Sequence, residues 1–244
     1  MAEALVNSAV RVSALRKRYG KLTALETVDL AVAPGEAFGL VGANGAGKTT
    51  LIRCLLDLCA YESGTIRIFG QPAGEPQSRR RLAYVPERFM PAHYLRCREF
   101  VEFLARSFGE RYDAARAQAM LSELELEAAV LERPVRSLSK GMTQKLGLAA
   151  AFLVARDLYV LDEPMSGLDP AARVAVKSVL RRLAAEGRTL FFTSHVLADV
   201  EELCSSIAVL EQGRVRWQGS PEGLCAQYRE TRLEQAFMRC VREK

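Results

Sequence analysis

One short run of glycines, ending in a lysine and a threonine, has the composition of a phosphate-binding loop. Residues 42–49 read G-A-N-G-A-G-K-T, which fits the pattern G-x-x-x-x-G-K-[ST]. Glycines let backbone N–H groups point inward at an anion, and a following helix adds its positive dipole end. Lys48 would place a cation at the β- and γ-phosphates, and the Thr49 hydroxyl is a hard oxygen ligand for Mg²⁺. The predicted phosphate contacts are Gly42, Asn44, Gly45, Ala46, Gly47, Lys48, Thr49 and Thr50.

Two acidic residues at the end of an apolar run would supply the carboxylates for such a site. Residues 158–163 read L-Y-V-L-D-E, and the carboxyl ends of parallel strands form a ligand crevice. Asp162 is expected to hold Mg²⁺ through water, and Glu163 to polarise the attacking water as general base. On these residues alone, a strand that simply ends in a polar loop is an equally good interpretation.

Two further candidates are less specific. Ser139 and the backbone N–H of Gly141 would lie at the N-terminus of a helix, which is another anion site. Any serine-capped helix has the same appearance. His195 follows a strand and is a candidate to bind a phosphate oxygen or relay charge, although a lone histidine at a strand end more often has a structural role.

Apolar periodicity and turn residues predict the strands and helices around these residues. Short apolar, β-branched segments predict strands at 10–15, 25–32, 36–41, 64–69, 82–85, 158–161, 189–193, 207–210 and 214–217. Longer segments predict helices at 47–59, 99–108, 114–126, 140–155 and 169–186. A further helix is predicted after the strand at 189–193, ending at 203, and a final helical region is predicted to begin at 220. Apolar strands separated by helices are typical of a parallel sheet covered on both faces.

The composition is that of an ordinary soluble globular protein of 244 residues, 49% hydrophobic and 26% charged. A net charge of +5 suits an anionic ligand or membrane surface, and a generic basic surface is an equally good explanation. The longest apolar run, 146–155, is about half of the ~20 residues of a spanning helix, and no secretory signal is visible. Six cysteines without C-x-x-C spacing predict reduced thiols in the cytoplasm, not a disulfide framework or a zinc site.

Taken in this order, the motifs resemble those of the ATP-binding cassette (ABC) family over nearly the whole chain. Residues 42–49 resemble the Walker A motif, 138–142 the family signature, and 158–163 the Walker B motif with the catalytic glutamate. Residues 166–169 resemble the D-loop, and His195 resembles the switch histidine. Tyr19 matches the aromatic residue that stacks on adenine, and packing of this ring in the core or at the surface is the competing interpretation.

The resemblance implies a P-loop NTPase fold of the α/β class. Its parts are a core with a mainly parallel sheet, an N-terminal antiparallel β subdomain and an inserted α-helical subdomain. The expected divisions are 1–87 for the ATP-binding core with the β subdomain and Walker A, 88–156 for the helical signature subdomain, 157–217 for the ATP-binding core with Walker B, D-loop and switch histidine, and 218–244 for a C-terminal helical tail.

The resemblance also implies an ATPase that uses Mg²⁺ and works as a head-to-tail homo- or heterodimer. Ser139 and Gly141 would then contact the γ-phosphate bound in the other subunit. ATP binding would close the dimer and drive a separate transmembrane permease, so the chain would lie on the cytoplasmic face of the inner membrane. No nucleic acid is expected as a partner.

Two departures from the family pattern point to one branch. Lys140 and Met142 replace the usual glycine and glutamine of the signature, and Glu87 stands where the Q-loop glutamine is expected. Glu87 is therefore a candidate for catalysis and for Mg²⁺, with an ordinary loop residue as the alternative. Both departures, and L-E-Q-A-F at 233–237, are similar to ATPase subunits of ABC-2-type exporters.

A second function competes with transport. A soluble ABC ATPase acting on ribosomes or nucleic acid would usually carry two cassettes in one chain or a long coiled-coil insertion. The sequence shows neither, and no stripe of basic and aromatic residues is evident.

Overall fold

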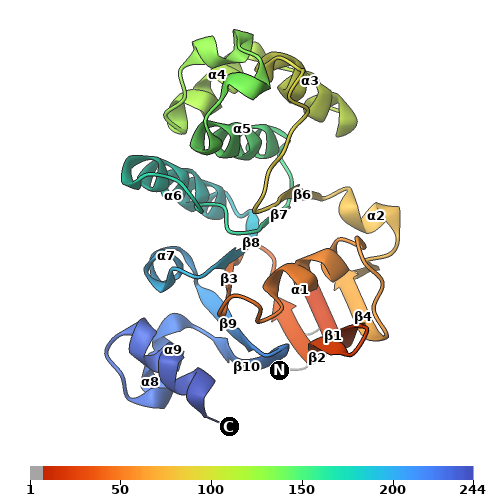
Figure 1. Cartoon of the computed structure of the whole chain (residues 1–244), viewed down its shortest axis with the longest axis vertical. Coiled ribbons are helices and arrows are strands. Elements are labelled where there is room, and N and C mark those ends of the chain that lie inside the picture. The colour runs from red at the N-terminus through yellow and green to blue at the C-terminus, as the bar shows by residue number, and fades with distance from the viewer. Residues whose placement is uncertain (1–7, 244) are drawn as a thin grey trace.

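Two sheets form the framework of the computed structural model, which describes residues 8–243 (Figure 1). One sheet has six strands in the order β10-β9-β3-β8-β7-β6 and the other has four in the order β2-β1-β4-β5. The larger sheet contains β3 (Ala37–Val41), β6 (Leu82–Val85), β7 (Leu158–Leu161), β8 (Thr189–Ser194), β9 (Ser206–Glu211) and β10 (Arg214–Gly219). Its pairings are parallel except between β9 and β10.

The smaller sheet is antiparallel throughout. It contains β1 (Val10–Tyr19), β2 (Leu22–Val32), β4 (Ser63–Ile68) and β5 (Gln71–Pro72). The predicted fold class, with a mainly parallel sheet and an N-terminal antiparallel sheet, is confirmed.

Helices cover the larger sheet and build a separate layer above it (Figure 1). They are α1 (Lys48–Leu55), α2 (Pro76–Arg79), α3 (Cys97–Ser107), α4 (Ala114–Glu123), α5 (Lys140–Leu153), α6 (Pro170–Ala185), α7 (Leu197–Leu203), α8 (Pro221–Tyr228) and α9 (Leu233–Arg242). Helices α3, α4 and α5 lie together, as expected of an inserted helical region, while the predicted division points stay predictions. Across residues 8–243, no helix combines the length and the apolar character needed to cross a bilayer.

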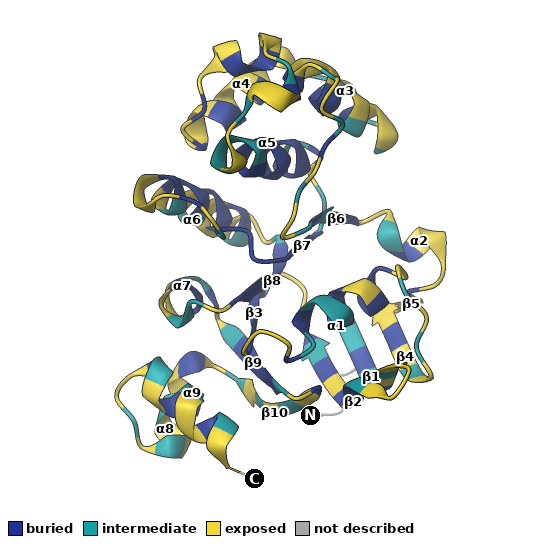
Figure 2. Ribbon diagram, viewed as in Figure 1, coloured by how far each residue is buried: buried dark blue, intermediate teal, exposed yellow. Residues whose placement is uncertain are grey.

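The central strands are buried along their whole length because both faces of the larger sheet are covered (Figure 2). Successive side chains of a strand point to opposite faces, and the core is divided accordingly. Phe38 and Phe191 stack with ring centroids 5.4 Å apart in a cluster shared with α1 and the antiparallel sheet. Tyr159 and Phe192 point to the other face, into a cluster shared with α5 and α6. The strands that end at the candidate site are thereby fixed on both sides.

Several predicted helix ends were wrong, and at two of them the cause is a backbone reversal that periodicity does not reveal. The first helix ends at Leu55 and not at 59, because Asp57 adopts a left-handed φ of 58°. Helix α4 ends at Glu123, just before Glu125 with φ 54°. The C-terminal helical region is two helices, separated at Arg229 with φ 54°. Helix α5 also stops early, at Leu153.

Candidate functional site

The glycine-rich loop connects β3 to α1 and can be built only with glycine at two of its positions. Gly47 caps α1 with φ 112°, in the left-handed region that favours glycine. At Gly42, a Cβ atom would lie 2.3 Å from the carbonyl oxygen of Leu210 on β9. The close approach of the loop to β9 therefore explains Gly42, and the left-handed backbone explains Gly47. The N-terminus of α1, which follows Gly47, faces the cleft and is available to an anionic ligand.

Lys48, the first residue of α1, is buried beneath this loop at 7% exposure. Its Nζ donates hydrogen bonds to the carbonyl oxygens of Gly42, at 2.8 Å, and Ala43, at 3.4 Å. The same Nζ lies 3.8 Å from Oε1 of Glu163. The ammonium is thus held inside the loop, facing a carboxylate at the end of β7.

Two hydroxyl groups orient the buried carboxylate of Asp162, which is 1% exposed. Thr49 Oγ1 donates to Asp162 Oδ2 at 3.0 Å, and Thr193 Oγ1 donates to Asp162 Oδ1 at 2.7 Å. Thr193 Oγ1 also accepts from the backbone N–H of Glu163 at 2.8 Å. Thr193 was not predicted as a site residue. Its position at the end of β8, the neighbour of β7, was the available signal.

Glu163 lies between the lysine and the predicted switch histidine. Its Oε2 is 2.8 Å from His195 Nδ1, and its side chain is 10% exposed. Its φ of 48° is left-handed, a conformation that costs a non-glycine residue on the order of 1–3 kcal/mol. The sequence predicted both residues but neither their contact nor this strained backbone.

A cleft of about 510 Å³ joins these groups. The predicted residues that line it are Tyr19, Asn44, Gly45, Gly47, Lys48, Thr49, Thr50, Glu87, Asp162, Glu163 and His195. Four more lining residues were not predicted: Leu22, Thr23 and Ala24 on β2, and Ala43. Gly42 contributes its carbonyl oxygen behind the loop, where Ala46 is buried.

The Thr49 hydroxyl and the Asp162 carboxylate lie side by side at one end of the cleft. Burial, and then the negative charge of Asp162, raises the pKa of Tyr84 to about 12. No group of three or more His, Cys, Asp or Glu side chains within residues 8–243 could hold a metal ion by itself. The Thr49 hydroxyl and the Asp162 carboxylate nevertheless fit Mg²⁺, which commonly takes one or two carboxylates and completes its shell with phosphates and water.

Ser139 and Gly141 do not line this cleft. Ser139 is the exposed N-cap of α5, and its Oγ accepts from the backbone N–H of Met142 at 3.2 Å. Gly141 faces Leu168 and Gly167 of the predicted D-loop. Within one chain, the predicted signature therefore lies apart from the predicted phosphate loop.

The profile of the ABC transporter family matches residues 25–166, which is more than half of the chain. The chain belongs to the ABC transporter family. Nod factor export ATP-binding protein I of Paraburkholderia xenovorans is 39% identical over 225 residues, covering 90% of the chain and 73% of that protein. An uncharacterized ABC transporter ATP-binding protein of Synechocystis sp. is 38% identical over 203 residues, covering 82% of the chain but only 57% of that protein. A solved ATP binding subunit of an ABC transporter is 31% identical, with a TM-score of 0.89 over 96% of the chain and 99% of that structure.

The chain is an ATP-binding subunit of this ABC transporter family and carries its ATPase domain. The family and the ATPase class predicted from the motifs are confirmed. The alternative of a soluble ABC ATPase acting on ribosomes or nucleic acid is not favoured. The roles of individual residues remain predictions, which the geometry of this ABC site makes testable.

Thr193→Val should reduce ATP turnover by about tenfold, because Asp162 loses a donor and the Glu163 N–H loses its acceptor. A lost hydrogen bond with a buried partner left behind costs about 1–3 kcal/mol, which sets this scale. Thr189→Val on the same strand is the matched control, since Thr189 Oγ1 also accepts one backbone hydrogen bond, from Gly35. Steady-state phosphate release and thermal unfolding of both variants give the answer. Equal turnover in the two variants would show that Thr193 supports only the fold.

Proposed function

We propose that the chain hydrolyses ATP as one half of a head-to-tail dimer, whose closure drives a separate transmembrane permease of an exporter. The observation that carries this proposal is the separation of Ser139 and Gly141 from the cleft of their own chain. The exposed N-terminus of α5 offers anion contacts that its own cleft does not use. A second subunit, turned to face the first, would bring them to the γ-phosphate.

Different residues of the cleft have different roles in ATP hydrolysis. Lys48 and the loop N–H groups bind the phosphates, while Thr49 and Asp162 would hold Mg²⁺, whose charge offsets that of the phosphates. Glu163 orients a water molecule and accepts its proton as the oxygen attacks the γ-phosphorus. The bond to the β–γ bridging oxygen then breaks and ADP leaves. His195 holds the Glu163 carboxylate in place.

Tyr19 is proposed to stack on the adenine. Its ring is 45% exposed and lines the cleft, and Lys17 Nζ lies 4.6 Å from the ring centre. A half-exposed aromatic ring beside a phosphate loop can bury one face against a base.

Large exposed side chains on α3 and in the segment before it support the permease as partner. Met90, Tyr94 and Phe103 are 84%, 82% and 63% exposed, although side chains of this size are usually buried. The first two lie in the segment between β6 and α3, and the third lies on α3. We propose that the permease covers these side chains, which would place the chain on the cytoplasmic face of the inner membrane. The name of the Paraburkholderia relative supports export as the direction.

Co-purification tests this function. A tagged Glu163→Gln chain is recovered from gently solubilised membranes in the presence of ATP, and its partners are identified by mass spectrometry. A polytopic membrane protein without its own cassette supports the proposal. Tyr94→Glu should lose this partner and keep its ATPase activity, whereas Val174→Glu, exposed on α6, should keep both. Recovery of ribosomes or nucleic acid without a membrane protein would overturn the transport function.

Glu87→Gln should keep turnover within a factor of about three, while Glu87→Ala should lower it about tenfold. Glu87 lines the cleft. The side-chain amide oxygen of a glutamine at this position can still contact water or Mg²⁺, whereas alanine has no side-chain oxygen. Phosphate release at varied Mg²⁺ concentration measures both variants. A fully active alanine variant would make Glu87 an ordinary loop residue. Collapse of the glutamine variant would mean that the carboxylate charge itself takes part.

A further inference from the structure

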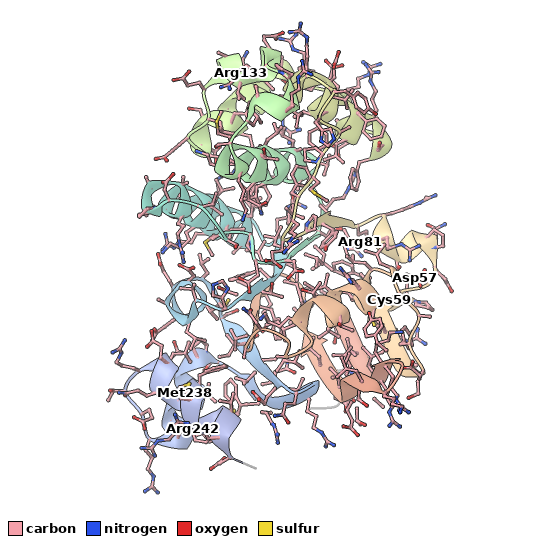
Figure 3. All side chains as sticks on the ribbon, viewed as in Figure 1. Asp57, Cys59, Arg81, Arg133, Met238 and Arg242 are labelled. Atoms are coloured by element: carbon pink, nitrogen blue, oxygen red, sulfur yellow. The ribbon has the colours of Figure 1, made fainter. Side chains whose placement is uncertain are left out.

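Two of the six cysteines face each other behind the nucleotide cleft. The sulfur atoms of Cys54, on α1, and Cys59, in the turn after it, are 3.5 Å apart, and both thiols are free. Sulfur atoms in a disulfide are about 2.05 Å apart, so closing the bond requires a movement of about 1.5 Å. Figure 3 labels Cys59 together with Asp57 in the turn between α1 and β4. The pair is therefore close enough to be joined by a small local change.

The two thiols differ in access, which sets the order of the chemistry. Cys54 is fully buried, and burial, followed by the Cys59 thiol, raises the pKa of Cys54 to about 12. Cys59 is only half-buried, and its turn contains the exposed Leu58 and the left-handed Asp57. An oxidant from solution consequently meets Cys59 first, and the turn is the part that moves.

Cys59 also touches the nucleotide cleft through Tyr19. The Tyr19 hydroxyl donates to Cys59 Sγ at 3.8 Å, and the Tyr19 ring lines the cleft. Burial and this thiol raise the pKa of the Tyr19 hydroxyl. A shift of the Cys59 sulfur toward α1 would remove one of the contacts that hold this ring, beside Lys17 over its face.

We propose that Cys54 and Cys59 form a redox modification site, which peroxide closes to a disulfide and which weakens ATP binding by releasing Tyr19. The Cys59 sulfur loses its proton as it attacks peroxide, the O–O bond breaks, and the leaving hydroxide takes that proton, so that a sulfenic acid and one water result. The Cys54 sulfur then loses its proton as it attacks the Cys59 sulfur, the S–O bond breaks, and the leaving hydroxide takes that proton and departs as a second water. Two thiols lose two electrons and two protons, and peroxide is reduced to two waters. The effect on ATP rests on the proposed contact of Tyr19 with adenine.

The experiment uses the purified full chain before and after hydrogen peroxide. Peptide mapping under non-reducing conditions should show a link between Cys54 and Cys59, with a mass loss of two hydrogens. ATP binding, measured by titration, should become about three- to tenfold weaker, as expected when an aromatic contact is lost, and dithiothreitol should restore it. Cys59→Ser should bind ATP equally before and after peroxide. Cys225→Ser, which changes a half-buried cysteine on α8, should respond as the unaltered chain does.

Two results would overturn the proposal. One is the absence of this link at a peroxide dose that oxidises Cys225. The other is a complete link with unchanged ATP affinity, which would separate the thiols from Tyr19. Failure of the reduced chain to bind ATP would instead refute the proposed function, and the mapped link would then stand by itself.

Discussion

Glu163→Gln is expected to lower ATP turnover by about two to three orders of magnitude and to leave ATP binding intact. Glutamine has the size of glutamate but cannot accept the proton of the attacking water. Lys48 keeps its hydrogen bonds to the carbonyls of Gly42 and Ala43, so the phosphate loop should retain its shape. Because the ATP-bound state is no longer consumed, the variant should accumulate as a closed dimer.

Three measurements on one preparation check this expectation: phosphate release, ATP titration, and gel filtration with and without ATP. Glu186→Gln is the matched control, since Glu186 follows α6 and pairs with the exposed Arg182. Full activity in the Glu163→Gln chain would show that another group is the general base. Loss of ATP binding would show that Glu163 shapes the cleft.

Lys48→Ala is expected to weaken ATP binding by about ten- to a hundredfold. A hydrogen bond to a charged group contributes about 1.5–3 kcal/mol, and Lys48 is the buried cation of the loop. The loss should be confined to the phosphates, so affinity for AMP should change little. Parallel titrations with ATP and AMP measure the difference.

Thermal unfolding of Lys48→Ala provides the control, because the lysine also tethers the loop carbonyls. Equal loss of ATP and AMP affinity would point to collapse of the loop. Unchanged affinity for ATP in a folded variant would remove Lys48 from the phosphate site.

The fold class could be predicted because its main signals are local. Apolar segments at 82–85 and 158–161 match β6 and β7 to the residue, since each run is bounded on both sides by a charged residue or a proline. Helix ends could not be predicted at Asp57 or Glu125, because neither an aspartate nor a glutamate is a reliable sequence signal of a left-handed backbone.

Much of the candidate site was predictable because the glycine-rich loop and the acidic pair each carry their own pattern. The links between them depend on strand order, which no local pattern contains. Thr193 meets Asp162 only because β8 lies beside β7. The contact between His195 and Glu163 arises in the same way, from two strand ends that are distant in sequence.

The left-handed backbone of Glu163 has a consequence for laboratory evolution. Glycine adopts that φ without steric cost, so a library selected only for heat resistance should enrich glycine at position 163. Each glycine variant selected in this way would lack the side chain to which we assign proton transfer. A screen for heat-resistant variants of this chain must therefore measure phosphate release as well as heat resistance, because otherwise it will select variants that do not hydrolyse ATP.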